Sequence, residues 1–495
     1  MRLQVQHSIC FSGYPLHLAC PPTYFTASRT IHTTRPDHAS LAATSASQAR
    51  SVSSPTSPVA RRHSKSPLGV LPFSQIIRTY VITTVSSSAY LLDICSALLR
   101  RLLESKSVLT NVDRNPILRA ILRQTFYKQF CSGSTRAEVQ ATIQGLQKCG
   151  YEGVILEYAL EVLKGEAGDE KVDIEKWRKG MLDTISMTNT GDFVGLKWSG
   201  LGSSALSLLQ QNKPPSRAMD TVMREVCAAA AEKGISLLPA AEETTTLDGF
   251  YNWTLPLQRD YNTSPESRPV VFCTYQAYLR STPATLAKHL WIAQREGFTF
   301  GIKLVRGAYL SSEHRHLLQP SIEATHAAYD SITSSLLKRK YELGGALQPL
   351  HGGDSKAWPN LAVVLATHNA VSVRNAQALR AQQVSQKEPL VPLAYAQLQG
   401  MADEVSCEIL SARNPSPQQH TQPEEHAGQV VDMEKAAVDV PKTYKCTTWG
   451  TTSECLNYLL RRAAENKDAA TRTKESRIAM GQEIRRRINA AFGLA

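Results

Sequence analysis

The chain has 495 residues, 42% of them hydrophobic and 20% charged, and its formal net charge at pH 7 is +12. This length accommodates one barrel-sized domain with extensions, or two smaller domains. The basic surplus is concentrated before Asp93, where Asp37 is the only acidic residue, and no stripe of aromatic and basic residues follows, which argues against nucleic-acid binding.

Residues 1–65 have the composition of a targeting segment. Ser, Thr, Ala, His and Arg predominate and acid is almost absent, which is typical of a mitochondrial transit peptide. A secretory signal is less favoured, because no apolar core of sufficient length follows Met1. The ten scattered cysteines form no C-x-x-C pair and favour free thiols in a reducing compartment. We therefore expect a mitochondrial protein whose first 65 residues are disordered and mostly removed.

Residues 66–130 are expected to form a helical arm. Apolar residues dominate this stretch, but Arg78 and Asp93 interrupt them. No window offers the roughly 20 uninterrupted apolar residues of a transmembrane helix. Helices packed on the core are favoured, and helices lying on a membrane surface stay open as an alternative.

Between residues 131 and 475, short apolar runs alternate with segments of helical period. The eight candidate strands are residues 153–159, 193–201, 235–243, 270–278, 300–309, 360–369, 390–401 and, more weakly, 447–450. Helix-sized intervals separate them, which predicts an α/β fold built as a (βα)8 barrel. A doubly wound sheet is the alternative, but its G-x-G-x-x-G turn is absent after the first strand.

Two further segments flank or interrupt this pattern. Residues 412–432 are rich in Pro, Gln, His and Glu and should be a solvated insertion before the last strand. We interpret His420 and His426 in that insertion as solvated side chains rather than metal ligands. Residues 476–495 should form a C-terminal helix.

Polar residues at the carboxyl ends of the strands are the candidate site, because ligands bind there in barrels of this kind. They are Lys197, Glu242, Gln276, Lys303, Arg306, His368, Asn369, Gln397 and Gln399. Cations and amides outnumber carboxylates, so the set fits neither glycoside hydrolysis nor a divalent metal, and we expect no metal. It fits an anionic ligand, such as a phosphate-bearing cofactor or a substrate carboxylate.

The helix after the last strand carries two adjacent arginines, Arg461 and Arg462, outside its leucine stripe, with Glu465 within helical reach of both. Two interpretations stay open. The spacing alone favours a surface ion pair. The alternative is a pair of guanidinium groups that grips a carboxylate above the barrel mouth.

Several stretches together resemble the proline dehydrogenase family, most closely its fungal mitochondrial form. They include GVILEYA, CTYQAYLRSTPATLAKHL, GIKLVRGAYL, ATHNA, AQLQGMADEVS and WGTTSECLNYLLRRAAENKDA, in the family's order. The resemblance implies a distorted, TIM-like (βα)8 barrel that binds FAD noncovalently and oxidises L-proline to Δ1-pyrroline-5-carboxylate. It also implies ubiquinone as the electron acceptor and a peripheral contact with the inner mitochondrial membrane.

Carried over residue by residue, the resemblance implies a substrate side and a cofactor side. On the substrate side, Lys197, Arg461 and Arg462 bind the proline carboxylate. Leu304 and Tyr309 line the proline ring. The positions that match flavin contacts are Gln276, Lys303, Arg306, Gly307, Thr367, His368 and Glu465.

Two departures from the family pattern fall on the substrate side. The third strand of the family ends in Asp-Ala-Glu, whereas this chain has Ala240, Ala241 and Glu242. The acid that orients one clamp arginine is therefore missing. Cys446 replaces an expected tyrosine, and Tyr444 lies two residues away, on the same strand face but farther from the mouth. We keep as an alternative a divergent relative that binds flavin or an imino acid with weak or no turnover, and proline and 4-hydroxyproline both stay open as substrates.

Overall fold

The computed structural model describes residues 66–493, with gaps at 106, 108–110, 113, 160–167, 265–267, 351–357, 414–439 and 466–469. The expected transit peptide, residues 1–65, lies outside this part of the chain. So does nearly all of the expected insertion, including His420 and His426. The boundaries assigned to these two segments therefore stay predictions.

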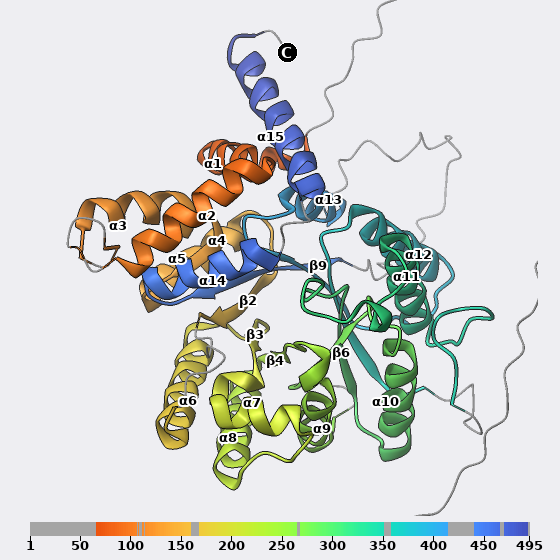
Figure 1. Cartoon of the computed structure of the whole chain (residues 1–495). Coiled ribbons are helices and arrows are strands. Elements are labelled where there is room, and N and C mark those ends of the chain that lie inside the picture. The colour runs from red at the N-terminus through yellow and green to blue at the C-terminus, as the bar shows by residue number, and fades with distance from the viewer. Residues whose placement is uncertain are drawn as a thin grey trace, which may run out of the picture. The chain divides into compact units, whose positions relative to one another are not determined.

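The described chain is organised around eight parallel strands (Figure 1). They are β2 (Gly153–Tyr158), β3 (Phe193–Leu196), β4 (Ser236–Pro239), β5 (Phe272–Gln276), β6 (Phe300–Val305), β7 (Leu361–Ala366), β8 (Leu393–Leu398) and β9 (Lys442–Trp449). Their spatial order is β4-β3-β2-β9-β8-β7-β6-β5. A parallel bridge between Leu237 and Val271 joins the two end strands, so the sheet nearly closes and the predicted (βα)8 barrel is confirmed.

The structure differs from the strand prediction at the strand ends and at two further places. Most predicted strands are too long, and Trp198–Leu201, predicted as the end of the second strand, forms a 3-10 helix. β9 begins at Lys442, earlier than the weak run 447–450, because its first residues are too polar to form an apolar run. A short strand, β1 (Cys131–Gly133), was not predicted; it pairs in parallel with β9, off the barrel path.

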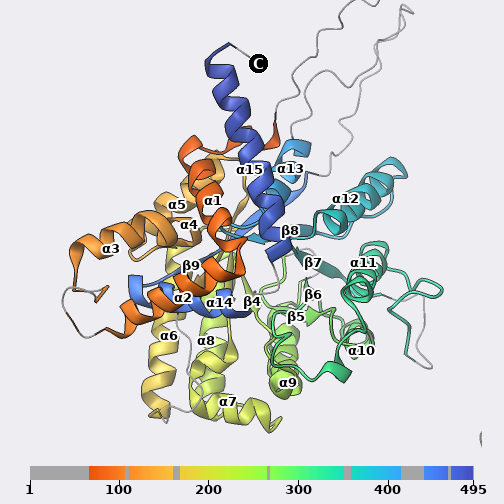
Figure 2. The same ribbon diagram turned by 45° about the horizontal axis from the view of Figure 1, so that its top comes forward.

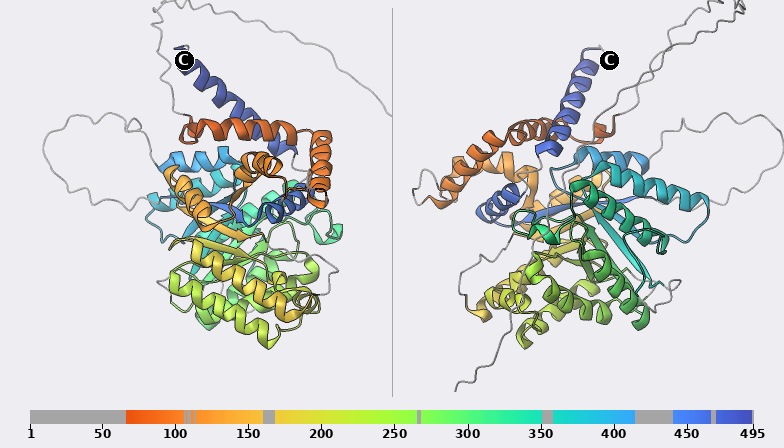
Figure 3. Two further views of the ribbon diagram at one scale, coloured as in Figure 1. Left: turned by 90° about the vertical axis from the view of Figure 1, so that its left-hand side faces the viewer. Right: turned by 45° about the vertical axis from the view of Figure 1, so that its right-hand side comes forward.

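Helices surround the strands, as Figures 2 and 3 show. They are α5 (Arg136–Lys148), α6 (Glu170–Met187), α7 (Ser203–Gln210), α8 (Arg217–Lys233), α9 (Thr244–Tyr261), α10 (Thr282–Glu296), α11 (Ile322–Lys338), α12 (Ala370–Ser385), α13 (Asp403–Arg413) and α14 (Thr452–Glu465). Side chains alternate between the two faces of a strand. One set packs against the helices, and the other, which includes Phe193, Leu238 and Tyr444, fills the barrel interior.

The N-terminal arm packs on the C-terminal helix. The arm contains α1 (Phe73–Ser86), α2 (Ala89–Glu104), α3 (Pro116–Leu122) and α4 (Lys128–Phe130), and the C-terminal helix is α15 (Ala470–Ala491). Ile76 of α1 and Met480 of α15 share one buried cluster, and Figure 2 shows the two helices together. No single helix in the described ranges is long and apolar enough to cross a membrane, although α1 and α2, bent by 102°, pass that test as a pair.

Candidate active site at the carboxyl ends of the strands

Lys197, Glu242 and Tyr309 meet at the mouth of the barrel, on the side expected to bind substrate. Lys197 directly follows β3, and its ammonium lies 3.3 Å from Glu242 Oε1. The same ammonium donates to the Tyr309 hydroxyl at 3.5 Å. The Lys197 and Glu242 side chains are 25% and 21% exposed, so an incoming carboxylate can reach the ammonium. The structure thus brings these three predicted residues together.

The two departures from the family pattern fall in different parts of the barrel. Ala240 follows β4 and donates its N–H to Leu196 O at 2.8 Å, but it offers no acid. Cys446 stands opposite Leu398 in the ladder between β8 and β9 and packs on the interior cluster. The Tyr444 hydroxyl donates to Gly191 O at 3.3 Å, before the start of β3. Tyr444 is therefore directed toward the opposite end of the barrel and cannot replace the missing tyrosine at the mouth.

Leu304 is not brought to the mouth. It is fully buried in the layer between strands and helices, because alternation along β6 directs Lys303 inward and Leu304 outward. On β8, Ala394 and Ala396 face the interior, so Leu398 is the leucine whose position on that face is nearest the mouth. The sequence analysis did not select Leu398. Its place in the site follows from its register along β8 and not from its residue type.

Arg461, Arg462 and Glu465 fall on the end of α14, and their side chains lie outside the described part of the structure. The preceding turn of that helix is tied to the barrel. The Tyr458 hydroxyl donates to Glu157 Oε2 at 3.3 Å, and Glu157 is near the carboxyl end of β2. Positions three and four residues apart share one face of a helix, so positions 461 and 462 lie on the face that carries Tyr458.

A second group surrounds Arg306, on the side expected to bind cofactor. Its guanidinium donates to His326 Nδ1 at 3.1 Å, to Thr367 Oγ1, and to Ser372 Oγ at 2.7 Å. It also lies 4.2 Å from the ring centroid of Tyr329. These partners come from α11, from the end of β7 and from the first turn of α12, so the planar guanidinium is held at the carboxyl ends of β6 and β7.

Lys303 is the clearest indication that this side binds a ligand. It is only 9% exposed, and its neighbours across the ladder are Thr274 and Val364. Within the described ranges its ammonium makes no hydrogen bond or ion pair. Burying a cation without a partner is costly, so a ligand with acceptor oxygens or nitrogens in the barrel mouth fits this residue.

The remaining cofactor-side residues are fixed by neighbouring elements. Gln276 is buried and donates to Glu242 O at 2.9 Å, which links the two sides. His368 Nε2 accepts the N–H of Leu398 at 3.1 Å. Gly307 has φ +134°, and a Cβ there would lie 2.4 Å from the Tyr278 ring, so the backbone permits only glycine at this turn. Across the described residues, no three His, Cys, Asp or Glu side chains gather as a metal site would require.

Known proteins resemble this chain in sequence and in fold. The sequence model described as proline dehydrogenase matches residues 139–475. The chain is 27% identical over 467 residues to the probable mitochondrial proline dehydrogenase of Schizosaccharomyces pombe, covering 82% of this chain and 88% of that protein. It is 29% identical over 419 residues to the hydroxyproline dehydrogenase of Bos taurus, covering 74% and 82%.

A solved structure is similar in fold. Proline utilization A (PutA) from Bdellovibrio bacteriovorus superposes with a TM-score of 0.53 at 15% sequence identity. The match covers 82% of this chain but 40% of the PutA chain. The barrel with its surrounding helices is thus shared with one part of a longer protein.

Proposed function

The chain belongs to the proline dehydrogenase family, and from this premise we propose that it oxidises L-proline to Δ1-pyrroline-5-carboxylate in proline catabolism, with FAD as its cofactor. One observation carries the proposal. Two groups, each centred on a basic residue, occupy the same end of the barrel: one is partly exposed around Lys197 and the other is held in place around Arg306.

The substrate side supplies the groups that a proline molecule needs. Lys197 binds the carboxylate, Tyr309 lies beside it, and Arg461 and Arg462 complete the clamp from α14. The Tyr458–Glu157 hydrogen bond supports this role, because it fastens the same face of α14 to the end of β2. Cations around the site also favour the neutral form of the proline nitrogen, which has to lose its proton for the C–N double bond to form.

The cofactor side fits a flavin. Arg306 and Lys303 offer positive charge, and Gln276, Thr367 and His368 offer polar contacts. Gly307 allows the turn after β6 to pack against the Tyr278 ring, and Glu465 contributes a carboxylate from α14. When bound, FAD supplies the acceptor for the hydride that leaves Cδ of proline. The protein's part is to hold proline by its carboxylate so that Cδ is presented in one orientation.

We further propose a mitochondrial location, ubiquinone as electron acceptor and a peripheral contact with the inner membrane. The relative from S. pombe is named mitochondrial. On α1 and α2, Val81, Tyr90 and Leu98 are 55%, 74% and 56% exposed. Exposed apolar residues grouped on neighbouring helices support a surface that meets a membrane.

The test is anaerobic reduction. Purified protein should be yellow, and L-proline should bleach the flavin absorbance in the absence of oxygen. A colourless protein that takes up no added FAD would contradict the proposal. Titration with 4-hydroxyproline under the same conditions decides between the two substrates.

A second candidate function is a family member that binds flavin or an imino acid with weak or no turnover. Ala240 and Cys446 favour it, because both replace polar groups of the family pattern. Flavin that is bound but stays oxidised in the presence of proline and 4-hydroxyproline would support this candidate over the first.

A further inference from the structure

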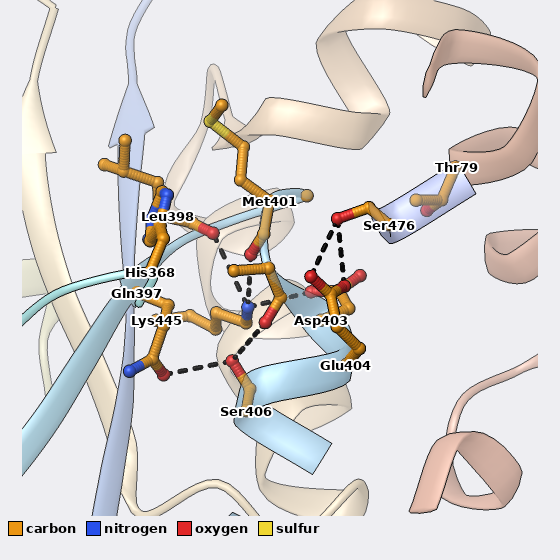
Figure 4. A network of polar contacts seen from close by, with 12 residues as sticks. Thr79, His368, Gln397, Leu398, Met401, Asp403, Glu404, Ser406, Lys445 and Ser476 are labelled. Carbon is orange, nitrogen blue, oxygen red and sulfur yellow. Dashed lines mark hydrogen bonds and ion pairs between the residues drawn. The ribbon is translucent and has the colours of Figure 1, made fainter. Parts of the chain in front are cut away.

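A buried ion pair lies behind the carboxyl ends of β8 and β9 (Figure 4). The Lys445 ammonium is 2.8 Å from Asp403 Oδ1, and the two side chains are 2% and 0% exposed. Alternation along β9 directs Tyr444 and Cys446 into the barrel, so Lys445 points outward, toward α13. The contact is an ion pair rather than an aligned hydrogen bond, because Oδ1 lacks a donor in hydrogen-bond geometry among the described atoms.

Lys445 also holds the turn between β8 and α13. Its ammonium donates to Met401 O at 3.0 Å and to Leu398 O at 3.5 Å. Two residues of this turn, Gly400 and Ala402, have φ values of +73° and +50°. The second is unfavourable for an alanine. Such a conformation persists only where surrounding contacts impose it. The buried cation provides two of these contacts, and Gln129 Nε2, which donates to Gly400 O at 3.1 Å, provides another.

The turn reaches the cofactor side through Leu398. Its carbonyl accepts from Lys445, and its N–H donates to His368 Nε2 at 3.1 Å. Figure 4 shows His368 and Leu398 next to each other above Lys445. An imidazole that accepts at Nε2 is neutral and carries its proton on Nδ1. The position of Leu398 thus fixes the orientation and the tautomer of His368.

A parallel contact ties α13 to the end of β7. Ser406 donates to Gln397 Oε1 at 3.0 Å, and Gln397 Nε2 donates to Thr367 O at 3.3 Å. Both Thr367 and His368 are therefore tied to the segment that Lys445 and Asp403 fasten together.

We propose that Lys445 is a positioning residue for the flavin site, which acts by fixing the β8–α13 turn so that Leu398 holds His368 as the Nδ1–H tautomer. The inference rests on the proposed function for the statement that His368 contacts flavin. Its structural part, the link from Lys445 to the His368 tautomer, can be measured without flavin.

The experiment compares Lys445→Met with the double variant Lys445→Met, Asp403→Asn in the full chain. The single variant leaves Asp403 buried without its counter-ion, which is strongly destabilising, whereas removing both charges is far less so. We therefore expect a lower thermal midpoint for the single variant and recovery of most of that loss in the double variant. Because the double variant recovers most of the stability, it tests whether Lys445 positions His368 separately from whether Lys445 stabilises the fold.

The readouts that matter are the 15N spectrum of labelled histidine and the flavin dissociation constant. The His368 signal is assigned from its absence in His368→Gln. In the double variant, we expect this signal to leave the Nδ1–H position and the flavin dissociation constant to rise about tenfold, since one hydrogen bond is no longer aligned. A double variant with the wild-type His368 signal overturns the proposal.

Glu483→Gln is the matched control. Glu483 is 1% exposed and paired with Arg486 and Arg487 on α15, so its loss should lower the thermal midpoint without moving the His368 signal. An equal shift of that signal in this control would mean general loosening and would also overturn the proposal. If the wild-type protein takes up no flavin, the proposed function fails, whereas the His368 signal still tests Lys445.

Discussion

The two sides of the barrel mouth are built differently. Around Arg306, hydroxyl, imidazole and ring contacts from two helices and a strand end hold the guanidinium in one place. Around Lys197, the described contacts include an ion pair with Glu242, in which both side chains are partly exposed, and a hydrogen bond of 3.5 Å to the Tyr309 hydroxyl. The cofactor side is therefore preorganised. If Lys197 binds the substrate carboxylate as proposed, that carboxylate has to share the ammonium with Glu242.

This difference bears on the departures from the family pattern. Ala240 lies on the loosely held side, since its N–H donates to the carbonyl of Leu196, and we expect the lost acid there to weaken substrate binding without disturbing the flavin. Cys446 lies opposite Leu398, whose N–H donates to His368 on the cofactor side. The comparison predicts that changes on the two sides separate in their effects. Substrate-side variants should alter KM, and cofactor-side variants should alter flavin retention.

The largest expected effect is on Arg461. Arg461→Met should raise KM for proline roughly 100-fold, because truncating one partner of a charge pair costs ~2–5 kcal/mol, while flavin content stays at the wild-type level. Steady-state kinetics and the flavin-to-protein absorbance ratio measure the two quantities. An unchanged KM would remove Arg461 from the substrate site, and lost flavin would assign it to the other side.

The next largest effect is expected from the substitution of Arg306. Arg306→Met should raise the flavin dissociation constant about 10- to 100-fold, since a hydrogen bond to a charged group is worth ~1.5–3 kcal/mol. Fluorescence titration of the flavin-free protein with FAD measures it. KM for proline at saturating FAD should change little.

Arg374→Met is the control for Arg306. Arg374 is 58% exposed and paired with Glu408, so its removal should leave the dissociation constant unchanged. If Arg306→Met binds FAD as tightly as this control does, the guanidinium belongs to the fold rather than to the cofactor site.

A smaller effect is expected from restoring the missing acid. Ala240→Asp should lower KM for proline about fivefold if the acid orients a clamp arginine, because a partly exposed ion pair contributes up to ~1 kcal/mol. Ala240→Asn has nearly the same size without the charge and serves as the control. If both variants keep the wild-type KM, Glu242 already supplies what the family's aspartate does.

The strands of the barrel could be predicted because each carries an apolar run separated from the next by a helix-sized interval. β9 could be predicted only in part, since Lys442, Thr443 and Lys445 break its apolar pattern although the last two are buried. The polar residues that prevent β9 from being recognised in the sequence include Lys445, which lies under α13.

The same distinction applies to the site residues: those marked by a local sequence pattern could be predicted, and those that depend on the folded arrangement could not. Arg306, Lys303 and Gly307 stand in one short motif next to a strand end, so a local pattern identifies them. Leu398 could not be chosen in this way, because its place in the site depends on strand register. Glu242 was chosen as a strand-end residue, but its ion pair with Lys197 could not be predicted, because it depends on which loops meet in space. For Leu304, the motif indicated the right strand but could not show which face the side chain takes.

The substitution with the smallest expected effect at neutral pH is that of His289. This residue lies behind β5, between the two sides of the barrel mouth. The Tyr275 hydroxyl and His289 Nδ1 lie 2.6 Å apart in the outer layer, next to Gln276, which donates to Glu242 O. Burial, and to a lesser extent Lys288, lowers the pKa of His289 to about 4. The unfolded chain, in which histidine has a pKa near 6.5, therefore binds more protons than the folded chain between these two values.

It follows that the stability due to neutral His289 is fully present above about pH 6.5 and is lost as the pH falls toward 4. Denaturant unfolding should show a loss of about 1 kcal/mol by pH 6 in the wild type, and His289→Gln should lack that part of the slope. The exposed His316, changed to Gln, should keep the wild-type slope. Because β5 adjoins both sides, KM should rise and flavin affinity should fall together only as the pH approaches 4, where His289 takes up its proton in the folded chain, unlike in the arginine variants. A His289→Gln protein with the full wild-type slope would place the titrating group elsewhere.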